Sequence, residues 1–335
     1  MTMSGGSSRH TAVLVSPGKT TPNSRQPTPG KIAVLPDADP FFVRAVEASG
    51  GVVEPVSDET RGIVWLSYSR ASELPEILHE NPQIEWVQLP WAGVDAFSKT
   101  ISQSDSEQSL LWTSAKGAYA QPVAEHALAL ILSLLRRIPE RVRAKSWGAK
   151  FGTSLYGLSV VIVGAGGIAV ELMRLLRPFG VNITIVRRTD LALPGADQTV
   201  TTERLVEVLP GADVVVIAAA LTDETTKLFG SEQLGAMKPS AILVNVARGG
   251  LIDTAALVEA LDADQIAGVG LDVTDPEPLP SSHELWNFDK VLITPHSADT
   301  PEMTSPLLAE RIRVNVRAFL NQSEFEGIVD PEVGY

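Results

Sequence analysis

Between residues 158 and 294 the sequence alternates short apolar runs with amphipathic segments, and this alternation constrains the fold more than any other feature. The apolar runs have the length of buried strands, and the segments between them have the length of helices. Strands that alternate with helices pair in parallel, because each helix returns the chain to the same end of the sheet. We therefore predict a doubly wound α/β domain with a six-stranded parallel sheet.

The elements of this domain follow from its apolar runs. The predicted strands are 160–163, 182–186, 214–218, 241–246, 266–271 and 291–294. The predicted helices between them are 168–178, 203–209, 231–237 and 254–261. A long helix is expected over 123–143, where the run 127–132 is apolar on nearly all sides, as in a helix buried in a core or an interface.

The preceding region shows the same alternation on a smaller scale. Strands are expected at 31–35, 63–66 and 84–89, with helices near 41–48 and 73–79, and a last helix is expected over 306–320. We predict a second, smaller doubly wound parallel-sheet domain, of flavodoxin-like type. Residues 1–30 carry four prolines, four glycines and no acid, and are predicted to be a disordered extension.

Composition excludes several classes of protein. The chain has 335 residues, with 27 Lys plus Arg against 40 Asp plus Glu and a formal net charge of −13, which disfavours nucleic acid and anionic membrane surfaces as partners. It contains no cysteine, so disulfides and thiolate ligands are excluded, and we predict no metal site. No apolar run near the N-terminus has the length of a signal-peptide core, so we expect a cytoplasmic protein.

A glycine-rich turn points to a dinucleotide. Gly164 and Gly166 directly follow an apolar strand and open a helix, with the small Ala169 three residues later. The first glycine permits a tight turn, the second lets a pyrophosphate approach the backbone, and the helix N-terminus attracts the phosphate charge. We predict a Rossmann dinucleotide-binding domain.

The end of the next strand bears on the choice of cofactor. A site that prefers NAD places an acid there to bind the adenosine ribose, whereas this chain has Arg187 and Arg188. Two guanidinium groups can bind a 2′-phosphate, so NADP(H) is favoured, while NAD(H) stays possible with Asp190 as a stand-in acid.

Three charged or titratable residues follow successive strands. Arg248, Asp272 and His296 are equally spaced, and each lies at the carboxyl end of a predicted strand, where ligands bind in open α/β sheets. A nicotinamide enzyme acting on a carbonyl needs a cation to hold the substrate and a group that transfers a proton, and Arg248 and His296 meet these needs. Glu277 close to His296 would stabilise the imidazolium, which favours reduction near neutral pH.

With these motifs the chain resembles the D-isomer-specific 2-hydroxyacid dehydrogenase family over about residues 31 to 325. The matching segments are 92–95, 123–126, 164–169, 245–253, 271–273, 277–279 and 294–296. The resemblance implies that Arg248 binds the substrate carboxylate and carbonyl, that His296 is the acid/base, and that Glu277 pairs with it. It also implies that the backbone of Ala92, Gly93 and Val94 grips the carboxylate.

The resemblance further implies contacts with the dinucleotide. Asp272 should contact the nicotinamide carboxamide, and the residues lining the cofactor should be Gly167, Ile168, Ala219, Val246, Ala247, Ser297 and Ala298. The implied substrate domain is split, 31–121 plus 298–335, around a dinucleotide-binding domain at 122–297, and the family forms a homodimer around the long helix. Departures include Gly167 for a frequent Arg, and Asp299 for a small residue, which puts the polarity of the pocket in doubt.

Other interpretations stay open. The resemblance is greatest to short reductases of glyoxylate and hydroxypyruvate, which convert a small 2-oxo acid to the D-2-hydroxy acid. A phosphoglycerate dehydrogenase-like enzyme or a dinucleotide-sensing, corepressor-like interaction protein are the alternatives, and a formate dehydrogenase would carry Gln at the position of Glu277. Among the other histidines, His283 is the rival proton donor, and His126 is expected to serve packing.

Overall fold

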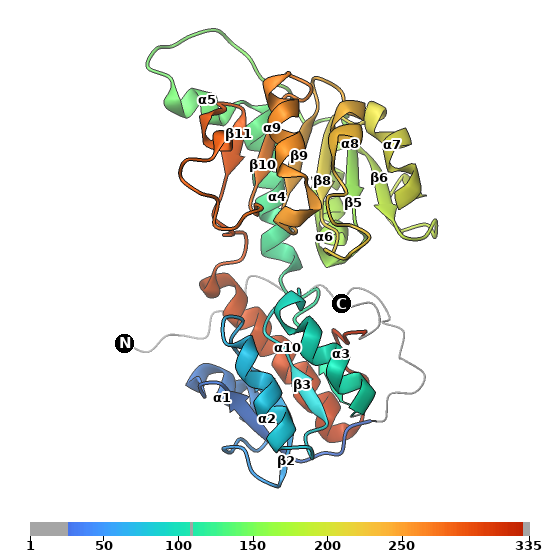
Figure 1. The fold of residues 1–335 in the computed structure, drawn as a ribbon. Helices are drawn as coiled ribbons and strands as arrows, with labels where there is room; N and C mark the ends of the chain where they lie inside the picture. The colour runs from blue at the N-terminus through green and yellow to red at the C-terminus, as the bar shows by residue number, and fades with distance from the viewer. Residues whose placement is uncertain (1–25, 108–109, 331–335) are drawn as a thin grey trace. The chain divides into compact units, whose positions relative to one another are not determined.

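A computed structural model describes residues 26–107 and 110–330. The chain divides into two compact units, which are described separately (Figure 1). The smaller unit takes in the described residues of Met1–Tyr119 and of Pro301–Tyr335, and the larger unit is Ala120–Thr300. Of the predicted disordered extension, residues 1–25 lie outside the described residues. In residues 26–30, the backbone amide of Thr28 donates to Glu85 at 2.8 Å.

The larger unit contains a parallel sheet with strand order β7-β6-β5-β8-β9-β10-β11. Its strands are β5 Ser159–Val163, β6 Asn182–Arg187, β7 Gln198–Thr201, β8 Val214–Ile217, β9 Ile242–Asn245, β10 Gly268–Leu271 and β11 Val291–Ile293. The order β7-β6-β5-β8-β9-β10 is the doubly wound Rossmann order, and β11 adds a seventh strand at one edge. The predicted count of six strands was wrong, because β7 is a four-residue edge strand in which only Val200 is buried.

Helices cover both faces of this sheet. They are α4 Ala120–Leu135, α5 Ile138–Arg143, α6 Gly167–Leu176, α7 Leu205–Val208, α8 Ser231–Ala236 and α9 Thr254–Asp262. Helices α4 and α6 pack together on one face, and α7, α8 and α9 pack on the other (Figure 1). Gly270 of β10 faces α4, and a Cβ there would lie 3.2 Å from the Cβ of Leu130, so glycine lets the long helix pack closely.

The single helix predicted over 123–143 is two helices. Helix α4 ends at Leu135, Arg137 adopts a left-handed φ of 52°, and α5 begins at Ile138 with Pro139 in its first turn. Proline has no N–H for the helix ladder and collides with the carbonyl four residues earlier, so a continuous helix through Pro139 is disfavoured.

The smaller unit contains a four-stranded parallel sheet in the order β1-β2-β3-β4. Its elements are β1 Lys31–Leu35, β2 Thr60–Trp65, β3 Trp86–Gln88, β4 Leu111–Thr113, α1 Pro40–Glu47, α2 Leu74–Glu80, α3 Ser98–Glu107 and α10 Pro301–Asn321. Val53 forms an isolated parallel bridge to Ile32 on the other side of β1, so the flavodoxin-like order is present with its second strand reduced to one bridge. Two elements, β4 and α3, have no predicted counterpart.

Two layers of helices enclose this second sheet. Helix α1 packs against α10 on one face, where Trp86 of β3 stacks on Phe319 at a centroid distance of 5.1 Å. On the other face the buried side chains of α2 and α3 meet inward residues of β2, β3 and β4. Among the described residues, no helix is both long enough and apolar enough to cross a membrane.

Candidate active site

The glycine turn lies between β5 and α6. Gly164 has a φ of 113°, and a Cβ there would collide with the carbonyl of Ala218, so no other residue fits this position. Gly166 is the N-cap of α6, and no described atom lies within 4 Å of the place of its missing Cβ. The first amides of α6 therefore border an open space in which an anionic group can approach the backbone.

The loop after β9 is held by a buried asparagine. The Asn245 side chain accepts from the backbone amide of Ala247 at 3.0 Å and donates to the carbonyl of Arg248 at 2.8 Å. A Cβ on the next residue, Gly249, would overlap the backbone of Thr274, so the loops after β9 and β10 are in direct contact. Arg248 itself is half-buried, and its Nη1 donates to the carbonyl of Ala247 at 2.8 Å.

Asp272, at the end of β10, is a buried anchor for the turn that follows β11. Its carboxylate accepts from the Ser297 amide at 2.9 Å, from the Ala298 amide at 3.2 Å and from the Thr294 hydroxyl at 2.6 Å. Burial raises the pKa of Asp272, but hydrogen bonds from His126, Thr294 and Ser297 outweigh it and leave the pKa below its usual value. The ionised carboxylate thus holds the two backbone amides that follow His296 and the Thr294 side chain that precedes it.

His296 and Glu277 form a hydrogen-bonded pair at this edge, at the positions predicted for the acid/base and its partner. His296 Nδ1 donates to Glu277 Oε1 at 2.7 Å, and the two side chains are 42% and 43% exposed. The His296 backbone adopts a left-handed φ of 48°, and its amide donates to the carbonyl of Asp272 at 2.8 Å. Because Nδ1 is engaged by Glu277, Nε2 is the ring nitrogen that can meet a substrate.

In the smaller unit, the predicted substrate residues form the loop after β3. Ala92 is exposed, Gly93 is half-buried and Val94 is buried ahead of a short 3₁₀ helix. The Trp91 ring packs edge-on against Tyr119, with ring centroids 5.8 Å apart. This loop therefore lies at the carboxyl end of a parallel sheet, which is the ligand-binding edge of such folds.

Comparison with known proteins identifies the larger unit. A family model described as the NAD binding domain of D-isomer specific 2-hydroxyacid dehydrogenases matches residues 128–298, just over half of the chain. The chain belongs to this dehydrogenase family. It is therefore an oxidoreductase with an NAD(P)-binding domain. The family suggested by the sequence motifs is confirmed.

Curated relatives of this dehydrogenase include proteins named glyoxylate reductase. An uncharacterized protein of Corynebacterium melassecola is 40% identical over 292 residues, covering 85% of this chain and 94% of that protein. A glyoxylate reductase of Pyrococcus furiosus is 36% identical over 222 residues, covering 63% of this chain and 66% of the reductase.

Solved structures match nearly the whole dehydrogenase chain. A D-isomer specific 2-hydroxyacid dehydrogenase of Xanthobacter autotrophicus in complex with NADPH and MES has a TM-score of 0.78 and 27% identity, covering 92% of this chain and 100% of that one. An NADPH-dependent glyoxylate/hydroxypyruvate reductase of Sinorhizobium meliloti in complex with NADP and malonate has a TM-score of 0.71 and 26% identity, covering 91% and 98%.

The larger unit of the dehydrogenase fits a dinucleotide. The open side of Gly166 and the uncapped first turn of α6 suit a pyrophosphate. The predicted cofactor residues all follow carboxyl ends of the sheet's strands, at Gly164, Gly166, Gly167, Ile168, Arg187, Arg188, Ala219, Val246, Ala247, Asp272, Ser297 and Ala298. Within the described residues, no group of three or more His, Asp or Glu side chains could hold a metal ion.

Two arginines stand beside the glycine turn in the dehydrogenase. The amide of Gly164 donates to the carbonyl of Val186 at 2.8 Å, and the next residue along β6 is Arg187. Arg187 is half-buried, with Nη1 3.5 Å from the carbonyl of Leu191, and Arg188 is exposed. The two arginines therefore stand at the carboxyl end of β6 and directly after it, where the adenosine end of a dinucleotide binds in folds of this kind.

Asp299 adds a second carboxyl near the reactive pair. Burial raises its pKa to about 6, partly opposed by the positive charges of His296 and Arg248 and reinforced by the negative charge of Asp272. These four residues interact electrostatically within one unit, so the departure noted at this position changes the charge of the site itself.

Two other histidines of the dehydrogenase have different roles. His126 lies 2.9 Å from the Thr294 hydroxyl and 3.3 Å from Asp272 Oδ1, so it supports the anchor and does more than pack. Because the Thr294 hydroxyl hydrogen is given to Asp272, His126 Nε2 must donate. His126 lies one helical turn from the buried residues Pro122 and Leu130. A histidine on the buried face of a helix needs a polar partner inside the fold, and this need could have indicated its contact with Thr294 and Asp272. His283 accepts from the amide of Leu285 at 3.2 Å and caps a short 3₁₀ helix.

Proposed function

We propose that this dehydrogenase uses NADPH to reduce a small 2-oxo acid, of the glyoxylate or hydroxypyruvate type, to the D-2-hydroxy acid. The observation that carries the proposal is the 2.7 Å contact between His296 Nδ1 and Glu277 Oε1 at the sheet edge that also bears Arg248 and the glycine turn. A histidine held by a carboxylate and open at Nε2 suits transfer of a proton to a carbonyl oxygen.

Arg248 binds the substrate in this proposal. Its guanidinium pairs with the carboxylate of the 2-oxo acid and polarises the adjacent carbonyl, since arginine presents a fork of donors to planar oxygens. The backbone of Ala92, Gly93 and Val94 supplies further donors to the carboxylate. When bound, NADPH supplies the hydride that reduces the carbonyl carbon.

His296 supplies the proton. As the carbonyl carbon is reduced, negative charge develops on its oxygen, and protonated His296 donates from Nε2 to form the hydroxyl. Glu277 holds the ring through Nδ1 and stabilises the imidazolium before the transfer. Oxidation of the hydroxy acid runs through the same groups in reverse, with neutral His296 accepting the proton.

The test is a substrate panel with the purified chain. Glyoxylate, hydroxypyruvate, a phosphorylated 2-oxo acid and longer 2-oxo acids are mixed with NADPH or NADH, and cofactor oxidation is followed by absorbance. We expect the highest kcat/KM with glyoxylate or hydroxypyruvate and NADPH, and a D-configured product wherever the product is chiral. Preference for the phosphorylated acid would favour a phosphoglycerate dehydrogenase-like role. Absence of oxidation with every acid would favour a dinucleotide-sensing interaction protein.

Arg187 and Arg188 provide the test of cofactor preference. Exchanging both for Gln should raise the KM for NADPH by about 10-fold or more and leave the KM for NADH nearly unchanged, because only NADPH carries a 2′-phosphate. Arg204→Gln is the control, since Arg204 is exposed in the same unit and pairs with Glu207 at 2.8 Å. An equal rise of both KM values would contradict a 2′-phosphate contact.

We further propose that the enzyme is a homodimer. The segment after α4 exposes apolar side chains that a second copy would cover, including Val142 at 77% and Trp147 at 91% exposed. Light scattering should give twice the chain mass of 35.8 kDa. Changing Val142 and Trp147 to Ser should yield monomers, whereas Leu191→Ser, at an exposed apolar residue elsewhere, should not.

A further inference from the structure

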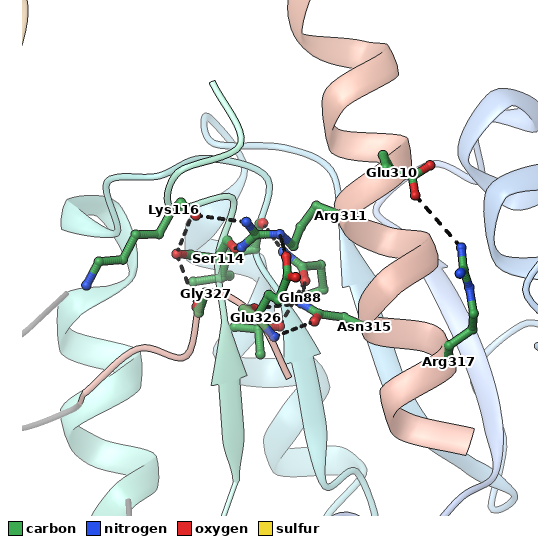
Figure 2. Close-up of polar contacts among 11 residues, drawn as sticks. Gln88, Ser114, Lys116, Glu310, Arg311, Asn315, Arg317, Glu326 and Gly327 are labelled. Atoms are coloured by element: carbon green, nitrogen blue, oxygen red, sulfur yellow. Dashed lines mark hydrogen bonds and ion pairs between the residues drawn. The ribbon is translucent and has the colours of Figure 1, made fainter. Parts of the chain in front are cut away.

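A buried arginine lies on α10 in the smaller unit. Arg311 is only 2% exposed, and burial lowers the pKa of its guanidinium, with Glu326 opposing that effect. A charge removed from water requires close polar partners. The guanidinium presents several hydrogen-bond donors in one fixed geometry, so a buried arginine is suited to binding several acceptors at once. Figure 2 shows the polar groups that surround Arg311.

The best hydrogen bonds of Arg311 go to backbone carbonyls and not to its counter-ion. Nη1 donates to the carbonyl of Ser114 at 3.1 Å, and Nη2 donates to the carbonyl of Lys116 at 2.9 Å. Arg311 Nε and Glu326 Oε2 are 3.4 Å apart, and within the described structure neither atom makes a hydrogen bond. The carboxylate thus compensates the charge, while the fork grips two carbonyls of the segment after β4 (Figure 2).

The gripped segment holds the loop after β3. Between the two gripped residues, the amide of Ala115 donates to the carbonyl of Trp91 at 3.0 Å. Tyr119, at the end of the same segment, donates its hydroxyl to the carbonyl of Pro90 at 2.6 Å and packs against the Trp91 ring. Two backbone carbonyls directly before Ala92 are therefore fixed by the segment that Arg311 orders.

The segment around Gly327 leaves room for the Arg311 guanidinium. Gly327 has a φ of 69°, and a Cβ there would collide with Arg311 Nη1 and with the carbonyl of Ser114. The carbonyl of Gly327 accepts from the amide of Ser114 at 2.8 Å. Asn315, one turn after Arg311, donates to the carbonyl of Glu326 at 2.9 Å and accepts from the Glu326 amide at 2.8 Å. The end of the chain and α10 thus enclose Arg311 against the segment after β4.

We propose that Arg311 is a positioning residue that holds the substrate loop Trp91–Val94 in place through the carbonyls of Ser114 and Lys116. Stability alone does not account for it, since a buried ion pair is often replaced by apolar residues without loss of stability. A fork that spans two carbonyls fixes backbone geometry, and small displacements of a substrate-binding group cost large factors in rate. Its kinetic consequence rests on the proposed function, in which this loop binds the substrate carboxylate.

The test removes the Arg311 guanidinium without leaving the Glu326 carboxylate as an uncompensated charge. The double variant Arg311→Met with Glu326→Gln removes both ionic partners, and Arg311→Lys keeps the charge but not the fork. Arg317→Met is the matched control, because Arg317 lies on the same helix, is more than half exposed and has its Nη2 3.8 Å from Glu310 Oε1 (Figure 2). Each variant is measured by amide hydrogen exchange over residues 89–97 and by steady-state kinetics.

We expect faster hydrogen exchange over residues 89–97, by about 10-fold or more, in the double variant and a smaller increase in Arg311→Lys. The KM for the 2-oxo acid should rise by about 10- to 100-fold while the KM for NADPH stays within about twofold, because the cofactor residues belong to the other unit. Loss of folded enzyme alone would lower the apparent kcat without this split between the two KM values.

Two results would overturn the proposal. One is unchanged exchange over residues 89–97 in the double variant, and the other is an equal change in Arg317→Met. The exchange measurement needs no turnover. If the wild-type chain reduces no 2-oxo acid, the proposed function fails, and the exchange data still decide whether Arg311 holds the loop.

Discussion

Each unit of this enzyme contains a buried charged side chain that binds loop backbone, and the two side chains, Asp272 and Arg311, carry opposite charges. In the larger unit, the carboxylate of Asp272 accepts hydrogen bonds from the amides of Ser297 and Ala298. In the smaller unit, the guanidinium of Arg311 donates to the carbonyls of Ser114 and Lys116. Both charges bind backbone groups of a loop at the carboxyl end of a parallel sheet.

The difference lies in what each anchored loop presents. The turn anchored at Asp272 carries His296, which pairs with Glu277, and both of these side chains are more than 40% exposed. The anchor at Arg311 orders a loop whose proposed contribution is backbone donors. A buried charge therefore organises backbone in both units, whereas the group proposed to react belongs to the larger unit only. Substitutions in the two units should accordingly affect different measurable quantities.

The largest expected effect is on rate in the larger unit. His296→Gln should lower kcat by about 10²- to 10⁴-fold, because the proton donor is lost, and should leave NADPH binding within about twofold. Stopped-flow reduction of the 2-oxo acid and NADPH fluorescence titration measure the two quantities. His79→Gln, at an exposed site on α2, is the control. Unchanged turnover in His296→Gln would contradict its assigned role.

The corresponding change in the smaller unit should affect stability. Asn315 is fully buried and also donates to Gln88 Oε1 at 2.7 Å, so Asn315→Leu leaves the half-buried amide and carbonyl of Glu326 without this partner and removes one of two donors to Gln88 Oε1. We expect a loss of about 3 kcal/mol in the free energy of unfolding, measured by urea denaturation. Asn321→Leu, at the exposed end of the same helix, should cost less than about 1 kcal/mol. The contrast between the units would fail if Asn315→Leu lowered kcat at saturating substrate by a larger free energy than it lowered the free energy of unfolding.

Asp299 should make the stability of the larger unit depend on pH. Its folded pKa of about 6 lies above its ordinary value of 3.8, so ionisation of this carboxyl opposes folding, and the stability it contributes at low pH is lost as pH rises through 6. Asp299→Asn should therefore raise the free energy of unfolding by up to about 3 kcal/mol at pH 8, relative to its effect at pH 4. Asp223→Asn, at an exposed site, should show a difference below about 0.5 kcal/mol. A pH-independent effect of Asp299→Asn would contradict the prediction.

The smallest expected effect comes from replacing Glu277, the hydrogen-bond partner of His296. Glu277→Gln should lower kcat by about 3- to 10-fold, on the order of 1 kcal/mol, because solvent screens a pair in which both side chains are more than 40% exposed. Glu284→Gln, at an exposed acid nearby in sequence, is the control, and an equal effect of the two variants on kcat would remove Glu277 from the mechanism.

Long apolar elements were predictable, and short polar ones were not. The strands of the larger sheet from β5 to β11 follow from their apolar runs, except β7, which buries a single residue. Helix α3 was not predicted because its residues are mostly polar, with Ile101 as its one residue in the buried core cluster. The break at Pro139 was readable from proline chemistry, and the prediction of one helix through it was wrong.

The placement of the candidate site residues was also predictable, because they follow strand ends. His296 and Glu277 are 19 residues apart, and a parallel strand-helix repeat brings such positions to one edge of the sheet. The role of His126 was not predictable in this way, because its contact with Thr294 joins residues 168 positions apart. Only the packing of α4 across the sheet creates that contact.

The sequence by itself determined the repeated strand-helix pattern, the glycine turn and the edge at which the reactive residues gather, since these depend on local periodicity and backbone sterics. The tertiary structure alone decided which charges are buried and which backbone groups they bind. Arg311 and Ser114 lie 197 residues apart, and nothing in either local pattern indicates that they meet. The physical reason is that the burial of a charge depends on every element packed around it, whereas a strand or a turn depends on a few neighbours along the chain.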